Sequence, residues 1–289
     1  MIKLLRQMYK GVSWRNPIIN AAFKLMDIPD LAVRYANGLL NLPRYSFRVR
    51  SRGIANQFGG KLFNEQGKFM VGLLQDYAGL QANSDVIEIG CGCGCAAIGL
   101  RSVLTAGSYR GMDIDIPSIY ACKSNHLFGE KFIFDRMDIF SAQYNPEGKI
   151  LASEYVFPYE NKSADIVFLT SVFTHMLPDD VAQYLSEIGR VLKDGGVLMC
   201  SVFLMDDGHD GASLSFPFDR GGYRLHQETI PERAVGYYYN FFQRECAKSQ
   251  MFPHGEKMLL GNWRRASKDG EDQKVNFGQD ILIFQKRMI

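Results

Sequence analysis

The sequence predicts an α/β fold in which a mostly parallel sheet lies between two layers of helices. Two observations support this prediction. Short β-branched and aromatic runs alternate with segments of helical periodicity along residues 85–205, and a glycine-rich stretch, GCGCGC at residues 90–95, joins one such run to a helical segment. Such alternation is typical of a parallel sheet with helices on both faces.

Five strands are expected in this region. The first, DVIEI, is short and β-branched, as a buried strand would be. The second ends in acidic residues and is followed by Pro117, which suits the first turn of a helix. The expected strands cover residues 85–89, 108–115, 131–140, 164–173 and 196–205.

The clearest expected helix covers residues 178–196. Its apolar residues recur at i, i+4, i+7 and i+11 on one face, namely Val181, Leu185, Ile188 and Leu192. Asp179 and Asp180 favour the positive end of the helix dipole, and Gly195 or Gly196 can end the helix.

The glycine-rich stretch could be a metal clip, a redox site or a ligand-binding turn. A zinc site needs converging ligands and a fourth partner, and no second Cys/His cluster at metal spacing is present, so no metal is expected. Cysteine is small enough for a crowded turn. A thiol near a helix start can have a lowered pKa, so Cys91 or Cys93 is expected to be sensitive to alkylation without being catalytic. A strand-to-helix turn of this kind brings backbone N–H groups close to a ligand.

Composition sets broad limits on function. Hydrophobic residues make up 46% and charged residues 22%, as in ordinary globular proteins, and the net charge of +2 gives no nucleic-acid signature. Residues 1–50 contain nine Lys/Arg and two Asp, a net charge of +7. No apolar run is long enough to span a bilayer. Six cysteines are too few for a disulfide scaffold, which favours a cytoplasmic location.

Together these segments resemble the class I S-adenosylmethionine-dependent methyltransferases. DVIEIGCGCG resembles their first motif, GMDID the second-strand motif with its ribose-binding acid, and RMDIF the third motif, which flanks adenine. ADIVFLTSVFTHM followed by EIGRVLKDGGVLM resembles the fourth strand, its helix and the turn into the fifth strand, and GQDILIFQKR at residues 278–287 resembles the last strand. The glycine spacing G-x-G-x-G also differs from the G-x-G-x-x-G of nicotinamide enzymes, because Cys95 follows the third glycine.

The resemblance covers roughly residues 80–205 and implies a Rossmann-like three-layer sandwich with a seven-stranded sheet. The expected organisation is a helical arm or cap over residues 1–75 and a methyltransferase domain over residues 76–289. Within that domain, residues 206–265 are expected to form a substrate lid and αβ extension after the fifth strand. Outside the motifs, the chain more weakly resembles bacterial small-molecule and sugar or glycolipid methyltransferases.

The resemblance also implies S-adenosylmethionine as cofactor and S-adenosylhomocysteine as product. A carboxylate after the second strand can accept both ribose hydroxyl protons, and Asp113 lies 23 residues beyond Gly90, near the usual spacing. Asp115 is better explained as a helix cap, and Asp138 can accept from the adenine amino group. The expected cofactor-binding residues are Glu88, Gly90, Cys91, Gly92, Asp113, Ile114, Asp138, Ile139, Thr170 and Ser171.

His175, just past the fourth strand, is the expected catalytic residue. An aliphatic hydroxyl acceptor needs a general base, whereas a phenol or amine can react through positioning alone. His209 and His226 lie in a long polar segment that could form a lid, and Trp263 could line the substrate pocket. The predicted function is methyl transfer to a small-molecule or glycan-like hydroxyl. N- or C-methylation, or a non-catalytic cofactor-binding subunit, remains an alternative.

The sequence says less about binding partners than about the cofactor. The basic N-terminal arm could lie on an anionic membrane or dock over the active site. Arg48, Arg50 and Arg52 would share one face if extended, where they could bind an anion or be solvated. The aromatic run at residues 234–247 suits a helix in the core or at a dimer surface. A homodimer is left open, and nucleic acid is not expected.

Overall fold

The computed structural model describes residues 17–52, 57–205, 214–264 and 278–288. The segment at residues 2–10, expected as a basic amphipathic helix, and His209 lie outside the described residues. No helix in the described part of the chain is long and apolar enough to cross a membrane.

The elements follow the expected alternation of strands and helices. The helices are α2 (Pro17–Ala36), α3 (Tyr45–Arg52), α4 (Lys61–Ala78), α5 (Cys95–Leu100), α6 (Ile116–Lys123), α7 (Pro178–Val191) and α8 (Tyr239–Lys248). The strands are β1 (Asp85–Ile89), β2 (Ser108–Asp113), β3 (Phe132–Arg136), β4 (Ala164–Leu169), β5 (Leu192–Leu204), β6 (Phe218–Asp219), β7 (Tyr223–Leu225), β8 (Val235–Tyr237), β9 (Met251–Leu259) and β10 (Asp280–Lys286). Short 3₁₀ helices are η1 (Ala152–Glu154), η2 (Phe173–His175) and η3 (Pro231–Arg233).

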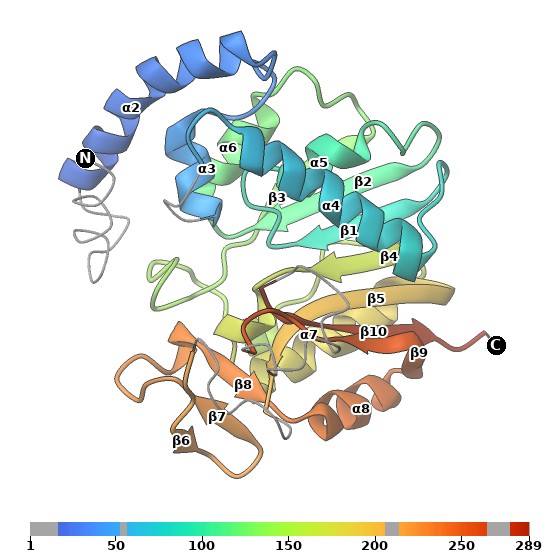
Figure 1. The fold of residues 1–289 in the computed structure, drawn as a ribbon. Coiled ribbons are helices and arrows are strands. Elements are labelled where there is room, and N and C mark those ends of the chain that lie inside the picture. Colours follow the sequence, from blue (N-terminus) through green and yellow to red (C-terminus); the bar gives the residue numbers. More distant parts are fainter. Residues whose placement is uncertain (1–16, 53–56, 206–213, 265–277, 289) are drawn as a thin grey trace, which may run out of the picture.

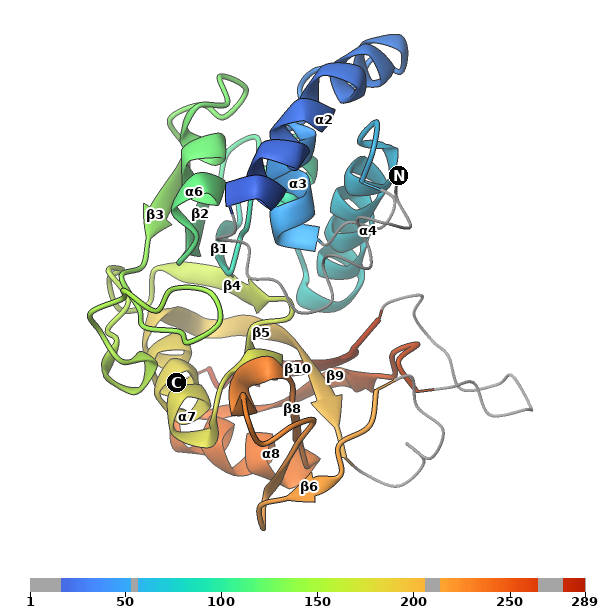
Figure 2. The same cartoon turned by 90° about the vertical axis from the view of Figure 1, so that its left-hand side faces the viewer.

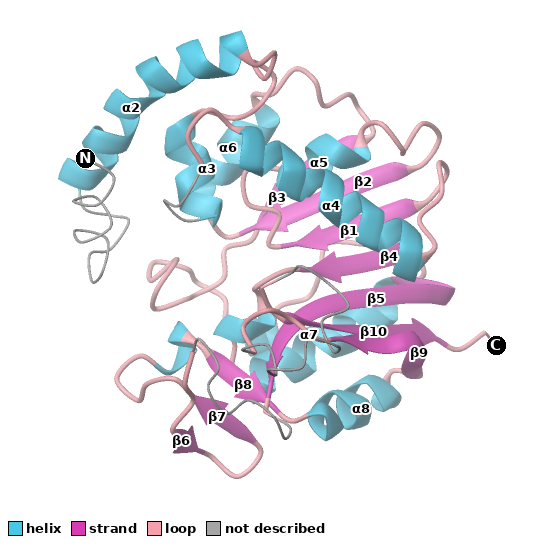
Figure 3. Cartoon of the chain, viewed as in Figure 1, coloured by secondary structure: helices cyan, strands magenta, loops and turns pink. Residues whose placement is uncertain are grey.

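The strands form one sheet that branches at β5 (Figure 3). One path runs in the order β3-β2-β1-β4-β5, and all its pairs are parallel. Strand β10 then pairs antiparallel with β5 and with β9, which gives the seven strands expected from the resemblance. The end of β5 also pairs with β8, which leads to β7 and β6, so the described sheet has ten strands instead of seven.

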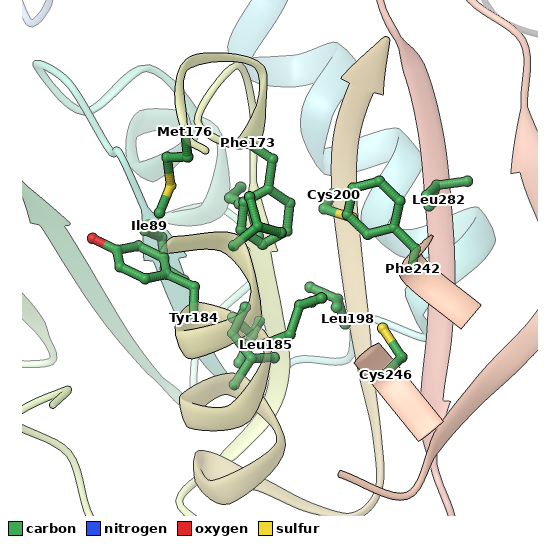
Figure 4. Close-up of a cluster of buried hydrophobic side chains, with 14 of the residues drawn as sticks. Ile89, Phe173, Met176, Tyr184, Leu185, Leu198, Cys200, Phe242, Cys246 and Leu282 are labelled. Carbon is green, nitrogen blue, oxygen red and sulfur yellow. The ribbon is translucent and has the colours of Figure 1, made fainter. Parts of the chain in front are cut away.

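Two hydrophobic cores cover the two faces of the sheet, which gives three layers. Helices α4, α5 and α6 lie on one face and α7 on the other (Figure 1). Because strand side chains alternate, Val86 packs beneath the first group, while Ile87 and Ile89 pack beneath α7 and α8. On the second face, Phe173 and Phe242 lie close together between the helices (Figure 4). The α/β class and its layered arrangement are therefore confirmed.

Helix α7 is shorter than the sequence predicts. It ends at Val191, and β5 begins at Leu192, inside the segment expected as helix. Lys193 supplies a physical reason. Its Nζ donates to Asp85 at 2.8 Å and to Asp165 at 2.9 Å, and these two carboxylates lie at the start of β1 and of β4. These ion pairs hold the chain in the sheet where helical periodicity alone would continue the helix.

The N-terminal arm packs on the helical layer above the sheet. Phe23 of α2 contacts Tyr45 of α3 edge to face. The arginine-rich segment is helical instead of extended, so its arginines do not share one face. Arg48 is fully buried and pairs with Asp30, and Arg50 pairs with Asp115, so neither is a solvated side chain. The first pair holds α2 and α3 together, and the second ties the arm to the body of the protein.

The aromatic run at residues 234–247 folds differently from the single helix expected. Its first residues form β8, and only the remainder forms α8. Tyr237 of β8 stacks on Phe241 of α8, with 4.9 Å between ring centroids, and both side chains are buried. The run therefore contributes to the core.

Candidate active site

A tight turn joins β1 to α5 and contains Gly90 and Gly92, with φ angles of +75° and +53°. A Cβ atom on Gly90 would lie 2.5 Å from Cγ2 of Val172, and one on Gly92 would lie 2.7 Å from Oγ of Ser51. Only glycine fits both the conformation and the space. The expected strand-to-helix turn is present, and its backbone is open to close approach by a ligand.

Asp113 ends β2 beside this turn. Its carboxylate accepts hydrogen bonds from the backbone N of Gly92 at 2.7 Å and of Asp115 at 2.8 Å. Burial raises the pKa of Asp113 to about 6, and these amide hydrogen bonds limit the rise. A carboxylate has about four lone-pair sites, so Asp113 can also accept from a ligand. Asp115 instead caps α6, because its Oδ2 accepts from the N of Ser118 at 3.0 Å.

Two adjoining cavities lie at the carboxyl ends of the parallel strands. The larger has a volume of about 420 Å³ and the smaller about 370 Å³. Five residues line both cavities: Ser51, Gly90, Gly92, Thr170 and Ser171. The larger cavity extends from Asp113 to His175, and the smaller one contains Gln66 and Gln279. Strand order reverses between β1 and β4, which is where ligands bind in open α/β sheets.

Most of the residues expected to bind cofactor lie together at these cavities. Those that line one or both are Gly90, Cys91, Gly92, Asp113, Ile114, Ile139, Thr170 and Ser171. Glu88 and Asp138 do not. Glu88 is buried on β1, where its carboxylate accepts from the hydroxyl of Tyr109. Asp138 accepts from Arg136 at 2.8 Å and is partly exposed.

His175 lines the larger cavity from η2. Its Nδ1 lies 3.0 Å from the backbone oxygen of Glu232, and its ring lies edge-on to Tyr144 with 5.5 Å between centroids. Burial lowers the pKa of His175, against the opposing effect of the Glu232 and Arg233 carbonyls. A carbonyl oxygen can only accept, so Nδ1 carries the proton and the neutral ring has its lone pair on Nε2.

The other expected substrate residues are not gathered at the cavities. His226 is held by the backbone oxygen of Ser215, 2.8 Å from Nδ1, and does not line either cavity. Trp263 is buried, and its Nε1 donates to Asp280 at 2.8 Å. Its ring packs against Phe203, so its place in the structure is in the core. His209 lies outside the described residues.

The structure adds site residues that the sequence reasoning missed. Ser51 of α3 covers the glycine turn, and its Oγ accepts from the N of Cys93 at 3.0 Å. Tyr144 and Glu232 join His175 in the larger cavity, and Gln66 comes from α4 into the smaller one. None of these residues lies in a motif, and each reaches the site through tertiary packing. The arginines of the arm indicated that it could bind an anion, but they did not identify Ser51.

Gln279, just before β10, has a fixed orientation at the smaller cavity. Its Oε1 accepts from Oγ of Ser171 at 2.9 Å and from Oγ of Ser201 at 2.6 Å. Ser201 Oγ in turn accepts from the N of Ser171 at 2.7 Å, and Ser171 has an unusual φ of +58°. Because donors surround Oε1, the amide nitrogen of Gln279 points its N–H groups away from these serines.

The three cysteines of the turn are buried, free thiols. Burial raises the pKa of Cys91 well above its ordinary value, and burial likewise raises that of Cys93. The expectation that a helix start would make Cys91 or Cys93 reactive is therefore wrong, because desolvation of the thiolate dominates. Among the described residues, no group of three or more His, Cys, Asp or Glu could hold a metal ion.

Comparisons with known proteins match part of this chain to a family and its fold to solved structures. Residues 87–200 match the family model described as a methyltransferase domain. A protein from Pyrococcus horikoshii has a similar fold, with 14% identity, coverage of 83% of this chain and 98% of that chain, and a TM-score of 0.55. A chain from the complex of the Trm112 methyltransferase activator with a methyltransferase of Haloferax volcanii is similar at 14% identity, 83% and 94% coverage and a TM-score of 0.53.

The YcgJ protein of Bacillus subtilis has the same fold at 16% identity, with 77% and 99% coverage and a TM-score of 0.51. At these identities the structures show the fold alone. The family match spans the glycine turn, Asp113 and the segment after β4, which are the parts that build the two cavities. Residues 87–200 of this chain therefore match a methyltransferase domain, within a fold that is shared with these solved structures.

Proposed function

We propose that the protein transfers a methyl group from S-adenosylmethionine to a hydroxyl oxygen of a small-molecule or glycan-like acceptor, with His175 as the general base. The observation that supports this proposal most directly is the state of His175. Its lowered pKa keeps the imidazole neutral at neutral pH, and its Nδ1 contact leaves a proton-accepting lone pair on Nε2. An aliphatic hydroxyl needs such a base, whereas a phenol or an amine does not.

The residues of the larger cavity fit the nucleoside part of the cofactor. The Asp113 carboxylate lines this cavity and can accept further hydrogen bonds, which suits the hydroxyls of a ribose diol. Ile114 and Ile139 line the same cavity and would contact the two faces of adenine. Gly90 and Gly92 of the glycine turn line both cavities, so the turn would lie beneath the chain that joins ribose to sulfur. The proposed fit of the nucleoside therefore rests on the Asp113 carboxylate and on the volume of the larger cavity.

The smaller cavity fits the amino-acid end of the cofactor. Oε1 of Gln66 is buried and has no hydrogen-bond partner among the described residues, so it can accept from an ammonium group. The N–H groups of Gln279 can donate to a carboxylate. The sulfonium would then lie near the five residues that line both cavities.

When bound, the sulfonium supplies an activated methyl group. The acceptor oxygen would take this methyl group as the carbon–sulfur bond breaks, which would give a methyl ether and S-adenosylhomocysteine. The acceptor proton goes to Nε2 of His175. Tyr144 limits the movement of the ring, and the Glu232 carbonyl fixes its tautomer. Positioning supplies the remaining rate enhancement.

The first experiment identifies the acceptor. Metabolites of producer cells with and without the gene would be compared by mass spectrometry for a difference of one methylene unit. With that acceptor in hand, His175→Ala should lower kcat by roughly 10²–10⁴. S-Adenosylmethionine affinity, measured by calorimetry, should change little. The wild-type kcat should rise with pH through a pKa below that of an ordinary histidine, because burial lowers it.

Tyr144→Phe is the matched control, because it keeps the ring beside His175 and removes only a hydroxyl. It should keep the pH profile. Full kcat in His175→Ala, with an amine or carbon acceptor, would instead indicate N- or C-methylation without this base.

A further inference from the structure

Helix α2 has an apolar face that the other described residues leave uncovered. Ile18, Leu25, Ile28 and Tyr35 are 71%, 70%, 74% and 73% exposed, and Leu31 is 50% exposed. Along all of α2 the only charged residue classed as exposed is Lys24. Scattered exposed apolar residues are normal, but a continuous row on one helix marks a surface that binds something.

The exposed row and the packed side of α2 are separate faces. Residues at positions 18, 21, 25, 28, 32 and 35 follow three- and four-residue spacing, so they line one side of the helix. The opposite side packs inward through Ile19, Phe23, Asp30 and Arg34. Figures 1 and 2 show α2 along the outer edge of the molecule, away from the strands. The row therefore contributes little to the fold of the monomer.

The charges around this row are almost entirely positive. Both acids of residues 1–50 are engaged internally, because Asp27 accepts from the N and Oγ of Ser46, each at 2.8 Å, and Asp30 pairs with Arg34 and Arg48. Lys24 and Arg44 remain exposed. The sixteen residues that precede α2 add Lys3, Arg6, Lys10 and Arg15 and no acid.

We infer that α2 is a membrane-binding surface that lies on an anionic lipid bilayer, with its apolar row in the headgroup region. Apolar residues flanked by cations favour anionic lipid, because burial of the row and attraction to lipid phosphate act together. No described helix is long and apolar enough to cross the bilayer, so α2 lies on the surface. A second copy of the chain fits less well, because both copies would bring the same positive charge to the contact.

The test uses the full-length chain and vesicle sedimentation. Wild-type protein should sediment with vesicles of mixed phosphatidylglycerol and phosphatidylcholine, and binding should weaken as salt is added. Vesicles of phosphatidylcholine alone should bind much less protein. The double variant Leu25→Glu, Ile28→Glu should lose roughly tenfold or more of its partition coefficient, because two buried apolar side chains are replaced by anions.

Val156→Glu is the matched control, because Val156 is 63% exposed on a loop beyond β3, away from the arm. It should bind vesicles like the wild type, and circular dichroism should show that every variant is folded. Lys24→Glu tests charge alone and should reduce binding mainly at low salt.

Equal binding of the double variant and the wild type would overturn the inference. So would light scattering that shows a vesicle-independent dimer dissociated by Leu25→Glu, Ile28→Glu, because a second copy would then cover the row.

Discussion

The two cavities differ in the kind of side chain that lines them. The larger contains several titratable groups, including Asp113, His175, Asp180 and Glu232, whereas the smaller is lined by amides, hydroxyls, glycines and one thiol. Burial raises the pKa of Asp180 and of Glu232 and lowers that of His175, so burial favours the neutral forms of these three groups. The difference indicates that pH dependence arises in the larger cavity, while the smaller one recognises its ligand by fixed hydrogen bonds.

The strongest test of this difference is Asp113, the carboxylate that faces the larger cavity. Asp113→Ala should weaken S-adenosylmethionine binding by roughly 1.5–3 kcal/mol, because hydrogen bonds to a charged acceptor are lost. Asp113→Asn is the milder comparison, because its carbonyl oxygen can still accept from one of the two amides, which donate to different oxygens of the carboxylate. Calorimetry on folded variants measures both. Unchanged affinity in Asp113→Ala would remove Asp113 from the cofactor site.

The same carboxylate should make cofactor affinity depend on pH. Its pKa in the free protein is about 6, above the ordinary value, so it becomes protonated as pH falls through 6. Only the ionised form accepts from both ribose hydroxyls. Affinity should therefore be full above pH 6 and should fall by up to about tenfold per pH unit below it. Asp113→Asn should abolish this dependence, and a wild-type affinity that is flat between pH 7 and pH 5 would contradict it.

The sequence was sufficient for the parts of the site that lie within continuous motifs. The glycine turn and Asp113 could be located because a strand, a turn and a helix start occupy fixed positions along the chain. Glu88 and Asp138 lie in the same motifs but do not line the cavities. Strand alternation directs Glu88 towards Tyr109, and the ion pair with Arg136 directs Asp138. Side-chain direction is set by packing partners that spacing does not reveal.

The rest of the site comes from segments without local signals. Ser51 reaches Cys93 from 42 positions away, and Gln279 reaches Ser171 from 108 positions away. The branch of the sheet at β5 likewise depends on a pairing with β8 that no turn signal in the sequence marks. These long-range contacts form only in the folded chain, so local sequence patterns do not predict them.

Two glutamines allow the cavities to be compared directly. Gln66 lines the smaller cavity and Gln143 the larger, and Oε1 of each is buried without a hydrogen-bond partner among the described residues. Gln66→Leu should weaken cofactor binding by about 0.5–1.5 kcal/mol, the contribution of one hydrogen bond, and should leave the KM of the acceptor unchanged. Gln143→Leu should raise the acceptor KM by a similar factor and leave cofactor affinity intact. Each variant is the control for the other.

A reversed pattern in these two variants would place the acceptor beside Gln66 and the cofactor beside Gln143. Calorimetry gives the cofactor affinity, and steady-state kinetics with the identified acceptor gives KM. Thermal unfolding should be measured alongside, because removing an unpartnered buried amide can itself stabilise a protein.

The smallest effect is expected at the thiol of the smaller cavity. Cys91 lines that cavity, and burial raises its pKa, so the thiol stays protonated and the cavity carries no charge from it. Cys91→Ala should change cofactor affinity by less than about 1 kcal/mol, because a thiol is a weak hydrogen-bonding group.

In the native protein, iodoacetamide should label Cys91 and Cys93 slowly, and unfolding should accelerate labelling, because only the thiolate reacts. Peptide mass spectrometry measures the labelling of each residue. Rapid native labelling of Cys91, suppressed by S-adenosylmethionine, would show an ionised thiol in the smaller cavity and would remove the distinction between the two cavities.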